Sequence, residues 1–393
     1  MRILMITAQY LPEVFGGAEQ QCRKLSSRLA ANNIHVTILT SRKNRTIPMK
    51  DNMDGVKIVR LNAYGPPQLL SLRYFYASLL WVIKAVCWGY KNRKTYDLIH
   101  VHQAKLQAFV GLVIAGLTKK RSIIKIGNSG SGFDLLTLKR KAFIGNFLYR
   151  YIVRNADIVI AISTNICKEL INTGISSHKI IFLPNGVEMS IDQIVPPEEK
   201  DNYRNDIKLP LDKKIFLFVG RLEKQKDILL LIDSFASAEP LKNKWLLILV
   251  GDGDLRYQIE NLVNKHEINE AVLLAGYQKN ILPYLLASDF FILSTKTEGL
   301  SNALLEAMSV GLVPISTDVS GSNDLIKHGS NGFLTEINSM ESLRNAIGQA
   351  GRLSKEEIYQ FGEKSMMLIK EKYEMDIITK HYIQLYKSID GKI

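Results

Sequence analysis

Short apolar runs alternate with segments of helical periodicity through both halves of the chain. In the first half, the apolar runs predict strands at 2–7, 35–40, 56–61, 98–101, 122–126, 158–162 and 180–183. Between them, apolar positions three and four residues apart predict helices, for example over 18–31 and 138–153. Strands that are apolar throughout and alternate with helices are typical of a parallel, doubly wound sheet.

The second half repeats this pattern and predicts a second sheet of the same kind. Its apolar runs predict strands at 215–219, 246–250, 272–274, 290–293 and 313–316, and the tail from 355 to 388 is helical in pattern. Residues 188–212 are rich in proline, aspartate and other charged residues, which is the composition of a linker. The pattern therefore predicts an α/β chain with domains at 1–187 and 213–374.

A chain of 393 residues is too long for one ordinary hydrophobic core and predicts two domains. Its composition, 46% apolar and 23% charged, is that of a soluble globular protein. The three cysteines, Cys22, Cys87 and Cys167, are too far apart for a disulfide framework or a zinc site, and they fit a reducing cytoplasm. Residues 1–7 lack a basic flank and predict a first strand, not a signal peptide. The apolar stretches at 77–90 and 106–117 are too short, or too interrupted, to span a bilayer.

The net charge of +13 is unevenly distributed along the chain. Residues 1–185 carry 27 Lys and Arg against 8 Asp and Glu, a net +19, whereas residues 186–393 carry 24 against 30, a net −6. One interpretation is an anionic partner for the first half: a membrane surface, a phosphorylated acceptor or a nucleic acid. The other is a lysine-rich solvated surface, which explains the total charge better than it explains the asymmetry.

Two carboxylates stand eight residues apart, Glu298 and Glu306, where a predicted strand gives way to a predicted helix at 302–310. Ser301 is placed to cap this helix. The free backbone N–H groups around residues 300–302 would favour an anion. Hydroxyl-binding carboxylates around an anion site suit a sugar nucleotide.

Other short motifs occur in a fixed order around this segment. They are Gly16-Gly17-Ala18-Glu19, His100-Val101-His102, Pro184-Asn185-Gly186-Val187, Gly220-Arg221-Leu222 with Lys226, Gly251-Asp252-Gly253, Gly321, and Gly329 to Gly332. Together they resemble retaining glycosyltransferases of family 4, with their E-x7-E motif, over nearly the whole chain. The resemblance implies a GT-B fold, in which two Rossmann-like doubly wound domains face a central cleft. It also implies an acceptor-binding first domain, a nucleotide-sugar-binding second domain, and a last helix, about 375–393, that packs back on the first.

The resemblance assigns roles to four charged residues of the second half. Glu298 would bind hydroxyls of the donor sugar, and Glu306 the ribose diol. Arg221 and Lys226 would lie in a strand-end loop and stabilise the departing diphosphate, although an ordinary basic loop has the same composition. The family usually has glycine after this lysine; here Asp227 follows, which would cap the next helix.

In the first half, Gly16 and Gly17 resemble the glycine loop that faces the donor diphosphate, and the alternative is a plain tight turn. Alternation places His100 and His102 on one face of a strand. By resemblance His102 lies near the donor sugar and is counted with the catalytic residues, and His100 is structural. A hydrogen-bonded packing role remains the alternative for His102.

The remaining candidate residues complete a donor pocket. Asp252-Gly-Asp254 has the form of a metal-binding DxD motif, but it follows a strand where the family has a glycine turn, so we expect no metal and predict that Asp254 caps the next helix. The donor-binding set is Gly16, Gly17, Gly220, Asp252, Ser294, Gly299, Leu300, Ser301 and Glu306. The glycine-rich segment 125–132 is either a mobile acceptor-side loop or a plain flexible connection.

The expected function is that of a retaining glycosyltransferase without metal or cofactor. It would move a hexose from a nucleotide diphosphate sugar, UDP favoured over GDP, to a saccharide acceptor, lipid-linked, in surface polysaccharide synthesis. The alternatives are a GT-B sugar-nucleotide epimerase and a basic membrane- or nucleic-acid-binding protein without catalysis; with the nucleotide motifs intact, no nucleic-acid partner is expected.

Basic residues interleaved with aromatics at 69–90 and 139–149 favour an anionic membrane surface. We therefore expect a cytoplasmic enzyme held peripherally on the inner face of the membrane. The alternative is a pair of helices packed on the sheet, with their lysines in water.

Overall fold

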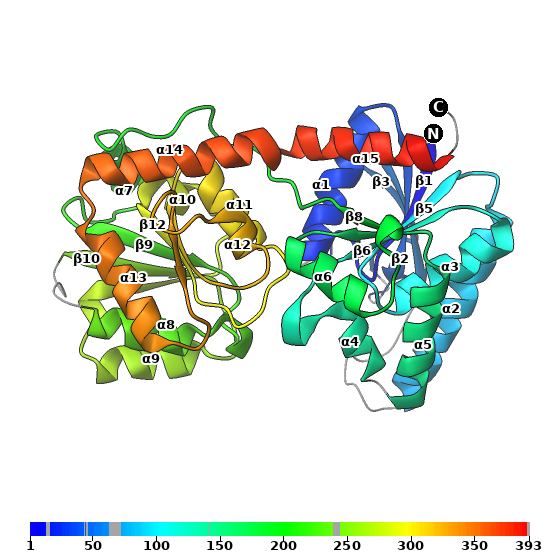
Figure 1. The fold of residues 1–393 in the computed structure, drawn as a ribbon, viewed down its shortest axis with the longest axis horizontal. Coiled ribbons are helices and arrows are strands. Elements are labelled where there is room, and N and C mark those ends of the chain that lie inside the picture. Colours follow the sequence, from blue (N-terminus) through cyan, green and yellow to red (C-terminus); the bar gives the residue numbers. More distant parts are fainter. Residues whose placement is uncertain are drawn as a thin grey trace. The chain divides into compact units, whose positions relative to one another are not determined.

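The computed structural model describes residues 1–12, 16–42, 44, 46–62, 72–140, 142–238 and 244–390. By its internal contacts the chain divides into two compact units (Figure 1). The first consists of Met1–Gly186 and Met375–Ile393, and the second is Val187–Glu374.

The described residues of the first unit form an eight-stranded sheet in the order β3-β4-β2-β1-β5-β6-β7-β8. The strands are β1 (Arg2–Ile6), β2 (His35–Arg42), β3 (Lys50–Met53), β4 (Val56–Asn62), β5 (Leu98–His102), β6 (Ser122–Ile126), β7 (Ile158–Ala161) and β8 (Ile180–Phe182). β3 runs antiparallel to β4, and the other pairs are parallel. The strand order reverses direction between β1 and β5, and in sheets of this kind ligands commonly bind at the carboxyl ends of the strands at such a point.

Helices cover both faces of this sheet. They are α1 (Gly17–Ala31), α2 (Leu72–Lys91), α3 (Leu106–Thr118), α4 (Asp134–Lys139), α5 (Ala142–Asn155), α6 (Thr164–Asn172) and α15 (Met375–Asp390). α15 lies beside α1, and its Tyr382 and Tyr386 are buried in the core that this pair forms with the sheet. α3 packs against the sheet through Val101 of β5. A Cβ built on Gly111 of α3 would lie 2.4 Å from the Val101 side chain.

The second unit contains a six-stranded parallel sheet, within the described residues, in the order β11-β10-β9-β12-β13-β14. Its strands are β9 (Lys214–Val219), β10 (Trp245–Val250), β11 (Val272–Gly276), β12 (Phe290–Leu293), β13 (Val313–Thr317) and β14 (Phe333–Thr335). Its helices are α7 (Lys200–Asp206), α8 (Ile228–Ser237), α9 (Arg256–Lys265), α10 (Leu282–Ala287), α11 (Asn302–Ser309), α12 (Ser322–Leu325), α13 (Met340–Arg352) and α14 (Lys355–Lys372). Here the order reverses between β9 and β12, which makes their carboxyl ends the natural binding position.

The predicted fold class is confirmed: both units are Rossmann-like α/β domains with parallel sheets. Two strands were not predicted, β3 and β14. The helix predicted at 138–153 was wrong in its bounds, because Leu138 belongs to α4 and α5 begins at Ala142. None of the described helices is long and apolar enough to cross a membrane.

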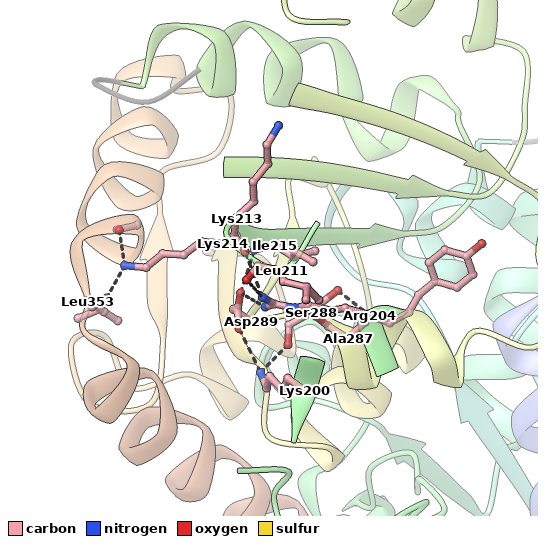
Figure 2. Close-up of polar contacts among 12 residues, drawn as sticks. Lys200, Arg204, Leu211, Lys213, Lys214, Ile215, Ala287, Ser288, Asp289 and Leu353 are labelled. Atoms are coloured by element: carbon pink, nitrogen blue, oxygen red, sulfur yellow. Dashed lines mark hydrogen bonds and ion pairs between the residues drawn. The ribbon is translucent and has the colours of Figure 1, made fainter. Parts of the chain in front are cut away.

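The segment predicted as a linker, 188–212, lies instead within the second unit and contains α7. Figure 2 shows why it is held there. Lys200 donates to the Ser288 carbonyl at 2.6 Å and Arg204 donates to Asp289 at 2.8 Å. Two of the charged residues that suggested a solvated linker, Lys200 and Arg204, therefore belong to a buried ion cluster.

Candidate active site

The carboxyl ends of β9 and β12 bring together two residues that are 72 positions apart in the sequence. The Lys226 ammonium lies 2.6 Å from Oε2 of Glu298, and their side chains are 17% and 19% exposed. Lys226 ends the turn η3 (Lys224–Lys226) after β9, and Glu298 lies in the loop after β12. The pair therefore sits at the reversal point of the second sheet, largely screened from water.

A set of hydrogen bonds between the same two loops fixes the backbone beneath Lys226. The Ser294 hydroxyl donates to the carbonyl of Lys226 at 2.8 Å, and the Thr295 hydroxyl donates to the carbonyl of Gln225 at 3.0 Å. The Lys296 N–H also donates to the Gln225 carbonyl at 2.9 Å, and the Gln225 amide donates to the Thr297 carbonyl at 2.9 Å. We call these contacts the clasp. Ser294, predicted to line the donor pocket, is 1% exposed and acts through the clasp.

Glycines allow the loops after β9 and β10 to lie against each other. Gly251 has a φ of +140°, and a Cβ built on it would lie 1.9 Å from the Gly220 carbonyl oxygen. Only glycine fits such an approach. A Cβ on Gly220 would in turn lie 3.8 Å from Cε of Lys226, so Gly220 borders the lysine side chain.

Two capping predictions near this turn were wrong. α9 begins at Arg256 after Leu255, so Asp254 does not cap it, and Asp252 accepts from the adjacent Gly253 N–H at 2.8 Å. Asp227 does precede α8, but its side chain makes no capping bond and lies 3.0 Å from Lys296. Asp227 has a φ of +50°, the left-handed conformation that a glycine there would adopt without strain.

Arg221 lies apart from the Lys226–Glu298 pair. Its guanidinium contacts Glu223 at 2.5 Å and its side chain is 63% exposed. The structure thus brings together one of the two predicted diphosphate cations and the predicted sugar-binding carboxylate. The other cation is held at the surface of the same loop.

The predicted N-cap of the following helix is confirmed. The Ser301 hydroxyl accepts from the Leu304 N–H at 3.3 Å and starts α11. The Gly299 carbonyl accepts from the Ser320 hydroxyl at 3.2 Å, which ties this loop to the loop after β13. Leu300 is buried, and Glu306 lies on the second turn of α11, partly exposed. This arrangement keeps Glu298 and Glu306 on one strand–loop–helix element.

In the first unit, the candidates lie at the reversal point between β1 and β5. Gly16 precedes α1, where the Glu19 carboxylate lies against it, and Gly17 is the first residue of that helix. His102 ends β5 with its ring 4.4 Å from that of His100, and both rings are buried. His100 bonds the Tyr386 hydroxyl at 2.8 Å. Both His100 and His102 thus lie at a strand end but inside the packed core of their unit.

Burial keeps these two imidazoles neutral. It lowers the pKa of His100 to about 3 and the pKa of His102 well below its usual value, with the positive charge of Lys125 adding to both shifts. Nε2 of each histidine is buried without a hydrogen-bond partner among the described residues. A neutral His102 could position a hydroxyl, but it would not act as a cation.

Family models match the two units separately. The model described as "Glycosyltransferase Family 4" matches residues 15–190, and "Glycosyl transferases group 1" matches residues 199–373. A galactosyltransferase of Escherichia coli, named UDP-Gal:alpha-D-GlcNAc-diphosphoundecaprenol alpha-1,3-galactosyltransferase, is 30% identical over 69% of this chain and 70% of its own. This chain is a glycosyltransferase of the family 4 type.

Two further comparisons extend over the whole glycosyltransferase. An uncharacterized glycosyltransferase of Methanocaldococcus jannaschii is 27% identical over 98% of both chains. The crystal structure of Anabaena HepE in complex with UDP superposes with a TM-score of 0.80 at 18% identity, covering 99% of this chain and 100% of that one. At that identity the likeness establishes the fold, which is GT-B.

Sequence reasoning missed several residues of this glycosyltransferase that shape the two strand ends. The side chains of Thr295 and Gln225, in the clasp, donate to backbone carbonyls. Because every residue has such a carbonyl, these contacts require no recognisable partner residue in the sequence. Lys125 stands opposite His102 in the β5–β6 register and is buried, which lowers its pKa to about 8. A lysine between isoleucines in the strand 122–126 was the available signal.

The glycine-rich loop after β6 is tied down by carboxylates. Asp134 accepts from the Gly127 N–H at 2.9 Å and from the Asn128 amide at 3.0 Å, and Glu169 accepts from the Gly130 N–H at 2.7 Å. Both sequence-based alternatives assumed a loose loop, and these contacts instead fix its path.

Acidic and histidine side chains do not gather into a metal site in the part of the chain that the structure describes. Asp252 is more than half exposed, and its nearest cation is Arg256 at 4.0 Å. The polar groups at the ends of β9 and β12 are instead suited to an anionic, hydroxyl-rich ligand.

Proposed function

We propose that this glycosyltransferase moves a hexose from a nucleotide diphosphate sugar to a saccharide acceptor, with retention of the anomeric configuration and without a metal ion. The observation that carries the proposal is the Lys226–Glu298 pair at the reversal point of the second sheet. A cation and a hydroxyl-accepting carboxylate in contact suit the junction of a diphosphate and a sugar.

Lys226 supplies the charge that the reaction needs. When the bond between the sugar C1 and the phosphate oxygen breaks, its electron pair leaves with the diphosphate, which gains negative charge. An ammonium held by Glu298, on a backbone that the clasp fixes, stabilises that charge electrostatically, because it need not reorganise during the reaction. Arg221, on the same loop, adds a second cation once it exchanges Glu223 for the diphosphate.

Glu298 and Glu306 bind hydroxyls at the two ends of the donor. Glu298 accepts hydrogen bonds from hydroxyls of the sugar, and Glu306 accepts them from the ribose. His102 and the Gly16–Gly17 turn are the residues of the first unit that take part in the reaction. The acceptor hydroxyl attacks C1 on the face that the diphosphate leaves, and its proton passes to a phosphate oxygen. This route uses no carboxylate as a covalent nucleophile, which agrees with Glu298 being held in an ion pair.

The names of similar proteins support the choice of substrates. The E. coli relative uses UDP-galactose and a diphosphoundecaprenol-linked sugar, and HepE was crystallised with UDP. We therefore propose a UDP-sugar ahead of a GDP-sugar and a lipid-linked saccharide acceptor in surface polysaccharide synthesis. Such an acceptor places the enzyme peripherally on the inner face of the cytoplasmic membrane.

Product analysis tests this function. The enzyme is incubated in EDTA with UDP- or GDP-hexoses and a panel of lipid-linked saccharides, and products are identified by mass and by the NMR coupling of the new anomeric proton. An α-configured product from an α-linked UDP donor is expected. An inverted product, a strict requirement for Mg²⁺ or Mn²⁺, or epimerised donor without any transfer would contradict the proposal.

A further inference from the structure

Helix α2 is apolar on the side that faces solvent as well as on the side that packs. Trp81 and Ala85 point inward and are buried. On the opposite side, Tyr76, Leu79, Leu80, Ile83 and Tyr90 are 59%, 45%, 53%, 51% and 46% exposed. We call these five residues the apolar stripe. Their spacing of three, four and seven residues makes them one helical face, and apolar faces of this kind mark interaction sites.

The apolar stripe belongs to a larger helical layer. α3 contacts both α2 and α5, which lie close to it in Figure 1. α5 exposes Ile144 and Phe147 at 56% and 58%, and the Phe147 ring lies 6.0 Å from that of Phe109 on α3. Trp81, one of the aromatics that suggested a membrane contact in the sequence, is therefore a packing residue, and the exposed surface is mainly aliphatic.

Charge around this layer has a single sign. α2, α3 and α5 contain no aspartate or glutamate. Between residues 55 and 133 there are twelve Lys and Arg, of which Arg60 and Lys125 are buried, but one acidic residue, Asp97, which is paired with Arg2 at 2.6 Å. Lys84 and Lys91 are exposed on α2 beside the stripe. This surface complements a negative one.

An anionic bilayer fits both properties better than an acidic protein would. The stripe has aliphatic residues in the middle and a tyrosine at each end, and tyrosine favours the level of lipid headgroups. Lysine stems can lie along the apolar surface while their ammonium groups reach phosphates. A helix of this composition lies in the plane of the interface and does not cross it.

We propose that α2 docks on an anionic bilayer, with the apolar stripe inserted at the acyl-chain boundary and Lys84 and Lys91 against the headgroups. This inference rests on the proposed function, since a lipid-linked acceptor is presented by that bilayer. It goes further in one respect, because it assigns membrane docking to one face of α2, whereas the proposed function names no docking surface.

Vesicle flotation of the full chain tests the inference. The wild type should float with phosphatidylglycerol-containing vesicles, float little with pure phosphatidylcholine, and retain part of its binding at high salt because of insertion. The double variant Leu80→Asp/Ile83→Asp should bind more than about tenfold more weakly, since burying one such side chain is itself about a tenfold effect. Ile171→Asp is the matched control, an exposed isoleucine on α6 of the same unit, and should bind like the wild type.

A second readout uses the native Cys87, which is exposed on α2 among the stripe residues. In a Cys167→Ser background, a polarity-sensitive fluorophore on Cys87 should shift to shorter wavelength when anionic vesicles are added. No shift, complete release by salt, or equal flotation of the double variant would overturn the inference. So would self-association of the wild type that the double variant abolishes in the absence of vesicle binding.

The outcome can be separated from the proposed function. Transfer to a short, water-soluble acceptor analogue should be unchanged in the double variant, because the stripe does not touch the donor site. A wild type that transfers sugar but does not float contradicts only the docking surface. A wild type that floats but transfers nothing contradicts the proposed function instead.

Discussion

β9 and β12 carry a group of charges at each end, and the two groups are built differently. At the start of these strands, Asp289 binds Lys200 at 3.3 Å, Arg204 at 2.8 Å and the Ile215 N–H at 2.8 Å (Figure 2). At their carboxyl ends, Lys226 and Glu298 form a single contact. The same pair of strands thus supports a connected network at one end and separate two-residue ion pairs at the other.

Each cation of the buried network makes more than one hydrogen bond. Arg204 also donates to the carbonyls of Ala287, Leu211 and Lys213, and the side chains of Lys200, Arg204 and Asp289 are only 8–11% exposed. Removing Asp289 would leave both cations buried without their shared partner. Lys226 and Glu298 are about twice as exposed, and each can exchange its partner for a ligand group. The first arrangement suits structure and the second suits binding.

Removing Asp289 should have the largest effect on stability. Asp289→Ala should lower the free energy of unfolding by about 3–5 kcal/mol, because Lys200 and Arg204 would remain buried without a counter-charge. Urea unfolding of the full chain measures it. Asp212→Ala is the control, an exposed carboxylate that lines one pocket of the second unit together with Asp289, and should change stability by less than about 0.5 kcal/mol. Equal stability of the two variants would contradict the proposed structural role of the buried network.

Removing Lys226 should damage catalysis and leave folding nearly intact. Lys226→Ala should lose roughly 2–4 kcal/mol of transition-state stabilisation, by analogy with lost oxyanion donors. Steady-state kcat/KM measures it, with the neighbouring exposed Lys224→Ala as the matched control. A normal kcat/KM for Lys226→Ala would eliminate the proposed electrostatic role.

Removing Glu298, the carboxylate of the Lys226–Glu298 pair, should impair sugar recognition without impairing nucleotide binding. Glu298→Ala should abolish transfer while UDP still binds, because its proposed contacts are with the sugar hydroxyls. Turnover assays and calorimetry on the same preparation check both halves. Near-normal turnover would show that Glu298 is not at the donor sugar.

The clasp should contribute a smaller, positional effect. Ser294→Ala removes the donor to the Lys226 carbonyl and should cost about 1 kcal/mol in kcat/KM, on the order of fivefold. Ser294→Thr keeps a hydroxyl and should restore most of the activity. If alanine and threonine behave alike, the hydrogen bond does not position the lysine.

An effect as small as that of Ser294→Ala is expected at Asp227, whose φ of +50° strains the turn after Lys226. Asp227→Gly should be about 1 kcal/mol more stable than Asp227→Ala, because only glycine adopts this conformation freely. Thermal unfolding of the two variants measures the difference. A more stable alanine variant would show that the turn relaxes to another conformation.

Most strands could be predicted because they are buried within the sheets, and buried strands consist of apolar residues that are visible in the sequence. β3 could not, since Lys50–Met53 is polar and pairs only at the sheet edge, and β14 is only three residues long. The predicted linker was wrong for a related reason. Lys200 and Arg204 resemble solvated charges until the fold supplies Asp289, more than eighty positions away.

The candidate site was predictable where a local signal exists. Ser301 is recognisable as a cap because its partner, the Leu304 N–H, is three residues away. The meeting of Lys226 and Glu298 depends on β9 lying next to β12, which the residues alone do not specify. Thr295 leaves no signal because it binds a backbone carbonyl.

Calorimetric titration of UDP into the wild type, Lys226→Ala and Lys224→Ala, all in EDTA, tests the central claim most directly. A charge-assisted contact to the diphosphate predicts metal-independent binding that is at least about tenfold weaker in Lys226→Ala and unchanged in Lys224→Ala. Equal affinity of all three proteins for UDP would contradict the placement of the donor diphosphate at Lys226.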